Sequence, residues 1–79
     1  MAQRWTKKDQ ALFAADEAVR CAEMALQTRS PNAVDEWIRR ARLARDEAKR
    51  LMPRSKATRQ AVQAVKTAEQ GVEFVDWRH

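Results

Sequence analysis

Few side chains in the sequence are of the types that carry out chemistry. His79 is the only histidine and the last residue, and Cys21 is the only cysteine. A general base must be held in a fixed position, and chain ends fray, so a terminal imidazole is a poor candidate. A lone cysteine forms neither an intrachain disulfide nor a multi-cysteine zinc site. We interpret Cys21 as a small buried apolar residue.

The carboxylates also suggest no reaction. Pairs such as Asp16-Glu17 and Asp46-Glu47 are adjacent in sequence, and adjacent side chains point about 100° apart around a helix. The sequence has no tyrosine, and its single glycine excludes a glycine-rich phosphate loop. We therefore expect a protein that works by binding, with no catalytic residue, no metal and no cofactor.

The most distinctive stretch is WIRRARLARDEAKRLMPRSK, residues 37–56, with eight basic and two acidic side chains. Such a density of positive charge can hold a phosphate backbone or an acidic protein surface. Part of the charge can instead be neutralised within one helix, because acids and bases four residues apart attract each other. The candidate pairs are Asp35 with Arg39, Glu36 with Arg40, and Arg42 with Asp46. Only cations without such a neighbour would remain for a partner.

The elements that position these charges are predicted to be helices. One glycine, two prolines and the many alanines favour helix almost throughout, because glycine and proline interrupt helices and alanine propagates them. We expect helices over about residues 6–29, 31–52 and 55–77. Equal helices joined by short turns favour antiparallel neighbours. The expected fold is all-α: one domain, residues 1–79, an up-down-up antiparallel three-helix bundle with an alanine-rich core. The alternative is a helical hairpin whose third helix completes a dimer.

Local signals mark the helix ends and the faces that should be buried. Thr6 with Asp9 predicts a capping box, and Ser30 and Ser55 are expected to cap the other two helices. Apolar residues at spacings of three and four predict the core positions Leu12, Ala15, Val19, Ala22 and Leu26; Val34, Trp37, Ala41, Ala44, Ala48 and Leu51; and Ala61, Val65, Ala68, Val72 and Val75. In the third helix a row of small residues would let a neighbouring backbone approach closely: Ala57, Ala61, Ala64, Ala68 and Gly71.

In this topology the second turn lies beside the start of the first helix. Basic side chains then gather at one end of the bundle, which we name the basic end: Arg4, Lys7, Lys8, Lys49, Arg50, Arg54, Lys56 and Arg59. Only Asp9, Asp46 and Glu47 oppose them locally. The chain has a net charge of +5, and we expect the excess at this end. The basic end is therefore the predicted contact for a polyanion or an acidic partner.

Some large apolar side chains fall outside the predicted core stripes. They are Phe13, Met24, Leu43, Phe74 and Trp77. Single exposed apolar residues are ordinary on protein surfaces. A Phe-Trp pair at a helix end can also close the end of a bundle core. However, aromatic residues and methionine are enriched at interface centres, and a chain this small cannot easily enclose them all. We interpret them as contacts to a partner protein or to a second copy.

These patterns favour a small non-catalytic binding protein, an adaptor or inhibitor that docks on a larger protein. The partner would offer an acidic or a nucleic-acid-binding surface. An inhibitor of a nucleic-acid-handling complex, in the manner of phage anti-CRISPR proteins, fits this class. Two alternatives stay open: direct, largely non-specific nucleic-acid binding by the basic end, and a homodimer or larger homo-oligomer with a structural role.

The sequence predicts no contact with a membrane. The first ten residues, MAQRWTKKDQ, lack the apolar run of a signal peptide. No stretch approaches the roughly 18 apolar residues of a membrane span. We therefore expect a cytoplasmic protein.

Overall fold

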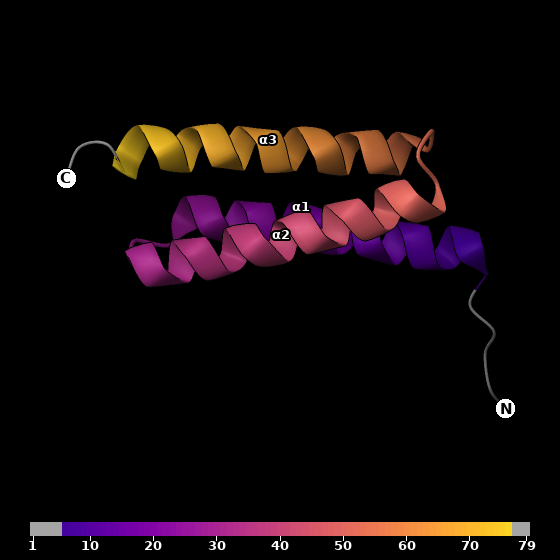
Figure 1. Cartoon of the computed structure of the whole chain (residues 1–79), viewed down its shortest axis with the longest axis horizontal. Coiled ribbons are helices and arrows are strands. Elements are labelled where there is room, and N and C mark those ends of the chain that lie inside the picture. The colour runs from indigo at the N-terminus through magenta and orange to yellow at the C-terminus, as the bar shows by residue number, and fades with distance from the viewer. Residues whose placement is uncertain (1–5, 77–79) are drawn as a thin grey trace, which may run out of the picture.

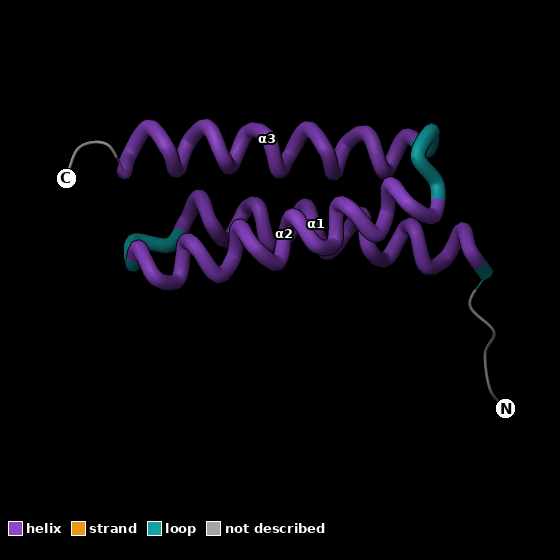
Figure 2. The backbone as a smooth tube through the Cα atoms, viewed as in Figure 1, coloured by secondary structure: helices purple, strands orange, loops and turns teal. Residues whose placement is uncertain are grey.

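A computed structural model of the chain describes residues 6–76, with side chains for residues 6–71. Three helices follow one another: α1 (Lys7–Gln27), α2 (Pro31–Leu51) and α3 (Lys56–Asp76). All three pack against each other, and the chain runs up, down and up along the bundle (Figure 1). Within residues 6–76 only helices and short connections occur (Figure 2). The predicted all-α three-helix bundle is confirmed.

The first two helices begin where the sequence signals place them. Thr6 Oγ1 accepts a hydrogen bond from the Asp9 N–H at 3.1 Å, and the Asp9 carboxylate accepts one from the Thr6 N–H at 3.3 Å. This confirms the capping box of α1. α1 ends two residues before the predicted boundary because Thr28 is already extended, with φ −81° and ψ 150°. Ser30 stands at the cap position of α2, but its side chain makes no capping hydrogen bond, so that expectation is wrong. Pro31 begins the helix instead with a preset φ.

The connection between α2 and α3 is a tight turn around Pro53. The Met52 N–H donates the last helical bond to the carbonyl oxygen of Ala48 at 2.8 Å, and the Ser55 N–H donates back to Met52 at 3.1 Å. The Ala57 N–H donates to Ser55 Oγ at 3.2 Å, which confirms the predicted cap of α3. Proline has no N–H to continue the helix. The short turn keeps the basic residues on both of its sides at one end of the bundle.

The core is built mainly from alanine. Its alanines are Ala11, Ala14, Ala15, Ala18, Ala22, Ala25, Ala41, Ala48, Ala61 and Ala68, and its larger apolar side chains are Cys21, Val34, Ile38, Leu51 and Val65. The predicted core positions of α2 and of α3 up to Ala68 are therefore buried, except Trp37 and Ala44, which are half-buried. The side chains of Val72 and Val75 lie outside the described part. Among the residues whose side chains are described, Thr58 is the buried polar one, and its hydroxyl donates to the carbonyl oxygen of Ala48 at 3.4 Å.

The buried face of α1 differs from the predicted one. Ala15 and Ala22 are buried as expected, but Leu12 and Leu26 are 44% and 48% exposed. The positions that point between α2 and α3 are all occupied by alanine or by Cys21. Helices that approach closely leave room only for small side chains at their contact. The two leucines therefore lie at the edge of the interface, and their placement on the core stripe is wrong.

Gly71 marks a close approach between α1 and α3. An ideal Cβ at Gly71 would lie 2.6 Å from Cδ2 of Leu26. Val19 precedes Leu26 by seven residues, and Ala64 precedes Gly71 by seven. Because α1 and α3 run in the same direction (Figure 1), this register places Val19 beside Ala64, and both are half-buried against the core. The row of small residues predicted in α3 therefore borders α1.

Gly71→Ala should stabilise the protein by about 0.5 kcal/mol. Alanine is favoured over glycine in a helix by roughly 0.8–1.0 kcal/mol, and turning a half-exposed leucine tip aside costs a fraction of that. Denaturant unfolding of parent and variant measures the difference. In a Leu26→Ala background, Gly71→Ala should raise the free energy of unfolding by the full difference between glycine and alanine in a helix, roughly 0.8–1.0 kcal/mol. A loss of stability in both backgrounds would show that the α3 backbone, rather than Leu26, limits the space.

Candidate docking surface

The start of α1, the end of α2 and the start of α3 lie together at one end of the bundle, on the right in Figure 1. This arrangement brings together seven of the eight predicted residues of the basic end, all of them exposed: Lys7, Lys8, Lys49, Arg50, Arg54, Lys56 and Arg59. Arg4, the eighth, lies outside the described residues. The fold therefore places the basic side chains as the topology predicted.

The carboxylates at this end already have partners. Asp9 closes the capping box of α1, and the Glu47 carboxylate lies 2.5 Å from Nη2 of Arg50. Asp46 Oδ1 lies 3.0 Å from Nε of Arg45. Six cations of the basic end form no ion pair with any described residue: Lys7, Lys8, Lys49, Arg54, Lys56 and Arg59. These six charges remain available to a partner.

The helix backbones add to the positive potential of the basic end. α1 and α3 begin there and α2 ends there. A helix N-terminus carries about half a positive elementary charge and a C-terminus about half a negative one. Two N-termini against one C-terminus leave a net positive contribution, which strengthens the attraction of the basic side chains for anions.

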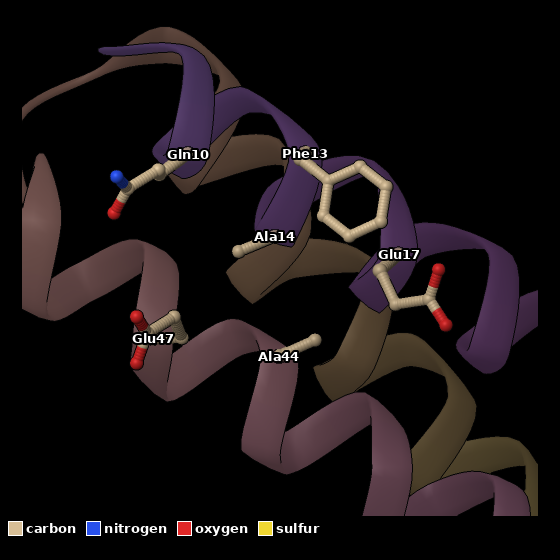
Figure 3. A pocket seen from close by; sticks show the side chains of 6 residues that line it. All are labelled: Gln10, Phe13, Ala14, Glu17, Ala44 and Glu47. Carbon is tan, nitrogen blue, oxygen red and sulfur yellow. The ribbon is translucent and has the colours of Figure 1, made fainter. Parts of the chain in front are cut away.

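An open hollow of about 340 Å³ lies between α1 and α2, beside the basic end (Figure 3). Ala14 of α1 and Ala44 of α2 line its floor, and the ring of Phe13 lies at its edge. The rim is completed by Gln10, Glu17 and Glu47. Phe13, a predicted apolar contact, is 59% exposed. Sequence reasoning missed the hollow because it arises from two alanines on different helices; the only signal was a large off-stripe Phe13 next to Ala14.

The other predicted apolar contacts do not join this hollow. Met24 is 41% exposed, and it lies 11 residues from Phe13, or about 16 Å along the helix at 1.5 Å per residue. Leu43 is 64% exposed on the outer side of α2. The side chain of Phe74 and all of Trp77 lie outside the described part. Phe13 is therefore the described residue of this set that lies beside the basic end.

One of the three predicted charge pairs within α2 is confirmed. Arg40 Nε donates to the Glu36 carboxylate at 3.0 Å. The Arg40 guanidinium also lies 5.2 Å from the centroid of the Trp37 ring, close enough for a cation–π contact. No ion pair joins Asp35 to Arg39, two residues that the structure describes in full. Arg40 is thus held to its own helix, while Arg39 is not.

The predicted pair of Arg42 with Asp46 is wrong. Arg42 instead pairs with Glu69 of α3, and Asp46 accepts from Arg45. Helical spacing predicts partners within one helix only, so it cannot identify a carboxylate 27 residues away. The Arg42–Glu69 pair ties α2 to α3 across their outer border.

Cys21 belongs to the core, as predicted. Burial, and secondly the neighbouring Glu17 carboxylate, raise the pKa of the Cys21 thiol above its usual value. The Cys21 Sγ lies 3.8 Å from Oε2 of Glu17. A thiol that stays protonated is a poor nucleophile, so this side chain contributes packing.

Within the described part of the chain, no group of three or more His, Cys, Asp or Glu side chains is arranged to hold a metal ion. None of the helices over residues 7–76 combines the length and the apolar character needed to cross a membrane. The chain matches no protein-family model, and neither a curated protein nor a solved structure is significantly similar to it.

Proposed function

We propose that this chain is a small non-catalytic binding protein, an adaptor or inhibitor that docks through its basic end on an acidic surface of a larger protein. The observation that carries the proposal is the set of six exposed cations that no described carboxylate neutralises. Like charges held close together repel each other and destabilise a fold. A partner of opposite charge relieves that repulsion when it binds.

The hollow beside Phe13 supports a protein as the partner. Protein interfaces combine an apolar centre with a polar rim. The alanine floor and the aromatic ring offer a place for an apolar side chain of the partner, and the cations of the basic end lie next to it. Glu17 and Glu47 on the rim would repel acidic groups there. They would thereby direct the acids of the partner toward the basic end and favour one orientation.

The partner class that suits this surface is a nucleic-acid-handling complex. A cationic protein of this size is attracted to the acidic and phosphate-bearing surfaces of such assemblies. An inhibitor of the anti-CRISPR kind would act by covering one of these surfaces, and an adaptor would act by holding it.

Affinity capture with the full chain tests the proposal. Nuclease-treated lysate of the source cell is passed over the immobilised parent and over a variant in which Arg54, Lys56 and Arg59 are glutamate. A protein held by the parent, released by salt and not held by the variant is the expected result. A protein held equally by both would contradict docking through the basic end.

A further inference from the structure

We infer that the border between α2 and α3 is a second binding surface, one that holds the phosphodiester backbone of nucleic acid. The surface consists of Arg42, Arg45, Lys49, Arg59 and Lys66, and we name it the α2–α3 basic face. This goes beyond the proposed docking of the basic end on a protein. Arg42, Arg45 and Lys66 lie outside the basic end, and the ligand is of a different class.

Three cations of α2 lie along its border with α3. Arg42, Arg45 and Lys49 are spaced by three and four residues, which places their side chains on one side of a helix. Arg42 forms an ion pair with Glu69 of α3, so this side of α2 borders α3. The row from Arg42 to Lys49 is about 10 Å long at 1.5 Å per residue.

Two cations of α3 lie along the same border. The Thr58 hydroxyl donates to the carbonyl oxygen of Ala48 at 3.4 Å, so Lys49 and Arg59, the next residues of the two helices, lie at the same level of the bundle. Lys66 follows Arg59 by two turns of α3. It precedes Glu69, the ion-pair partner of Arg42, by one turn. The five cations therefore form two rows that run side by side along the antiparallel helices.

The cations of this face can bind a new anion without dismantling the fold. Lys49, Arg59 and Lys66 are exposed and form no ion pair with a described residue. Arg42 and Arg45 each pair with one carboxylate. A guanidinium has five N–H donors in a planar fork, so one carboxylate leaves donors for a phosphate oxygen.

The composition of the face favours nucleic acid over protein. The exposed large apolar side chains of the described residues are Leu12, Phe13, Met24 and Leu26 on α1, and Leu43 on the outer side of α2. None of them lies on α3. A protein interface needs an apolar centre, whereas phosphate contacts alone supply essentially all of non-specific nucleic-acid binding. A charged border with no large exposed apolar side chain among its described residues therefore suits a phosphate backbone.

The remaining helix, α1, differs from α2 in the sign of its net charge. Over residues 7–27, α1 carries four carboxylates and three cations, and Arg20, the cation outside the basic end, pairs with Asp16 at 3.1 Å. Over residues 31–51, α2 carries six cations and four carboxylates, and over residues 56–76, α3 carries three of each. A polyanion is therefore attracted more strongly to the cations of α2 and of the α2–α3 basic face than to α1 beyond its first turn.

Titration of a mixed-sequence DNA duplex of about 20 base pairs, at several salt concentrations, tests the inference. The variant Arg42→Gln with Lys66→Gln removes two cations from the face and leaves the basic end unchanged. We expect it to bind roughly tenfold more weakly than the parent, with a slope of log K against log salt that is smaller by about 1.8, since each phosphate contact contributes about 0.9. Arg20→Gln with Arg39→Gln removes the same charge elsewhere and should keep the slope of the parent.

Each outcome separates this inference from the proposed function. Equal slopes for the parent and the Arg42/Lys66 variant would overturn the inference, while capture of a protein by the basic end is measured without DNA and would stand. Polyglutamate of matched charge is the second probe. If it binds as tightly as the duplex at the same salt concentration, the face has no preference for phosphate and the inference fails. Thermal melts of all variants should agree within a few degrees, because the one described ion pair lost from the face, Arg42–Glu69, is exposed.

Discussion

Ala68→Leu lowers the free energy of unfolding by about 1–3 kcal/mol, because it overpacks a core that has no room for three more carbons. Ala68 is fully buried among alanines and Val65. Leucine there must push α3 away from its neighbours or adopt a strained rotamer. A domain of this size is stabilised by only a few kcal/mol. The variant should therefore unfold at a clearly lower denaturant concentration.

Gln63→Leu is the matched control for this prediction. Gln63 lies on the exposed side of the same helix, where its amide donates to Thr67 at 3.4 Å. The same leucine placed in solvent should change the free energy of unfolding by less than about 0.5 kcal/mol. If Ala68→Leu and Gln63→Leu lower the free energy of unfolding by the same amount, Ala68 does not lie in the core. The packing of α3 described above would then be wrong.

Reversing three charges of the basic end should abolish docking without unfolding the protein. Arg54→Glu, Lys56→Glu and Arg59→Glu change the local charge by six, which should weaken partner binding by at least about 100-fold at low salt. None of the three side chains takes part in a described ion pair. The substitutions therefore break no such pair. Acidic side chains near the start of α3 also suit the helix dipole. The thermal melt should therefore stay almost unchanged.

The control removes positive charge elsewhere on α2. Arg39→Ala with Arg40→Ala breaks one exposed pair, that of Arg40 with Glu36, which is worth a few tenths of a kcal/mol. Binding should change little, and titrations at low and near-physiological salt compare the two variants with the parent. If the Arg54, Lys56 and Arg59 variant binds as well as the parent, the basic end is only a solvated surface. The hollow beside Phe13 would then be the better candidate for the docking site.

The sequence was sufficient for three features that depend on neighbours along the chain, although the equally local Ser30 cap is absent. The capping box of Thr6 and Asp9, the Ser55 cap and the stop at Pro53 involve residues within four positions of each other, and their chemistry is local. The basic end followed from these boundaries, because equal helices with short turns favour the up-down-up topology over the alternative of a hairpin whose third helix completes a dimer. Of the candidate site, the described cations were therefore placed correctly.

The features that depend on distances between helices could not be predicted. Leu12 and Leu26 are more hydrophobic than the alanines beside them, yet both lie at the edge of the interface. At Leu26 the backbone of α3 approaches closely, at Gly71. Arg42 finds its carboxylate on α3 rather than one turn away. The hollow depends on Ala44 facing α1. Helical periodicity predicts which face of a single helix is the most apolar. The packing of the helices decides which small residues come into contact with each other.

The position of the docking surface can be measured directly from the reactivity of the five lysines. Lys7, Lys8, Lys49 and Lys56 belong to the basic end, and Lys66 lies outside it on α3. Acetylation of each lysine is followed by mass spectrometry in the isolated protein and in its complex with the captured, nuclease-treated partner. We predict that the lysines of the basic end react several times more slowly in the complex, while Lys66 reacts at the rate of the isolated protein. Unchanged rates at Lys7, Lys8 and Lys56, in a complex that has formed, would contradict docking through the basic end.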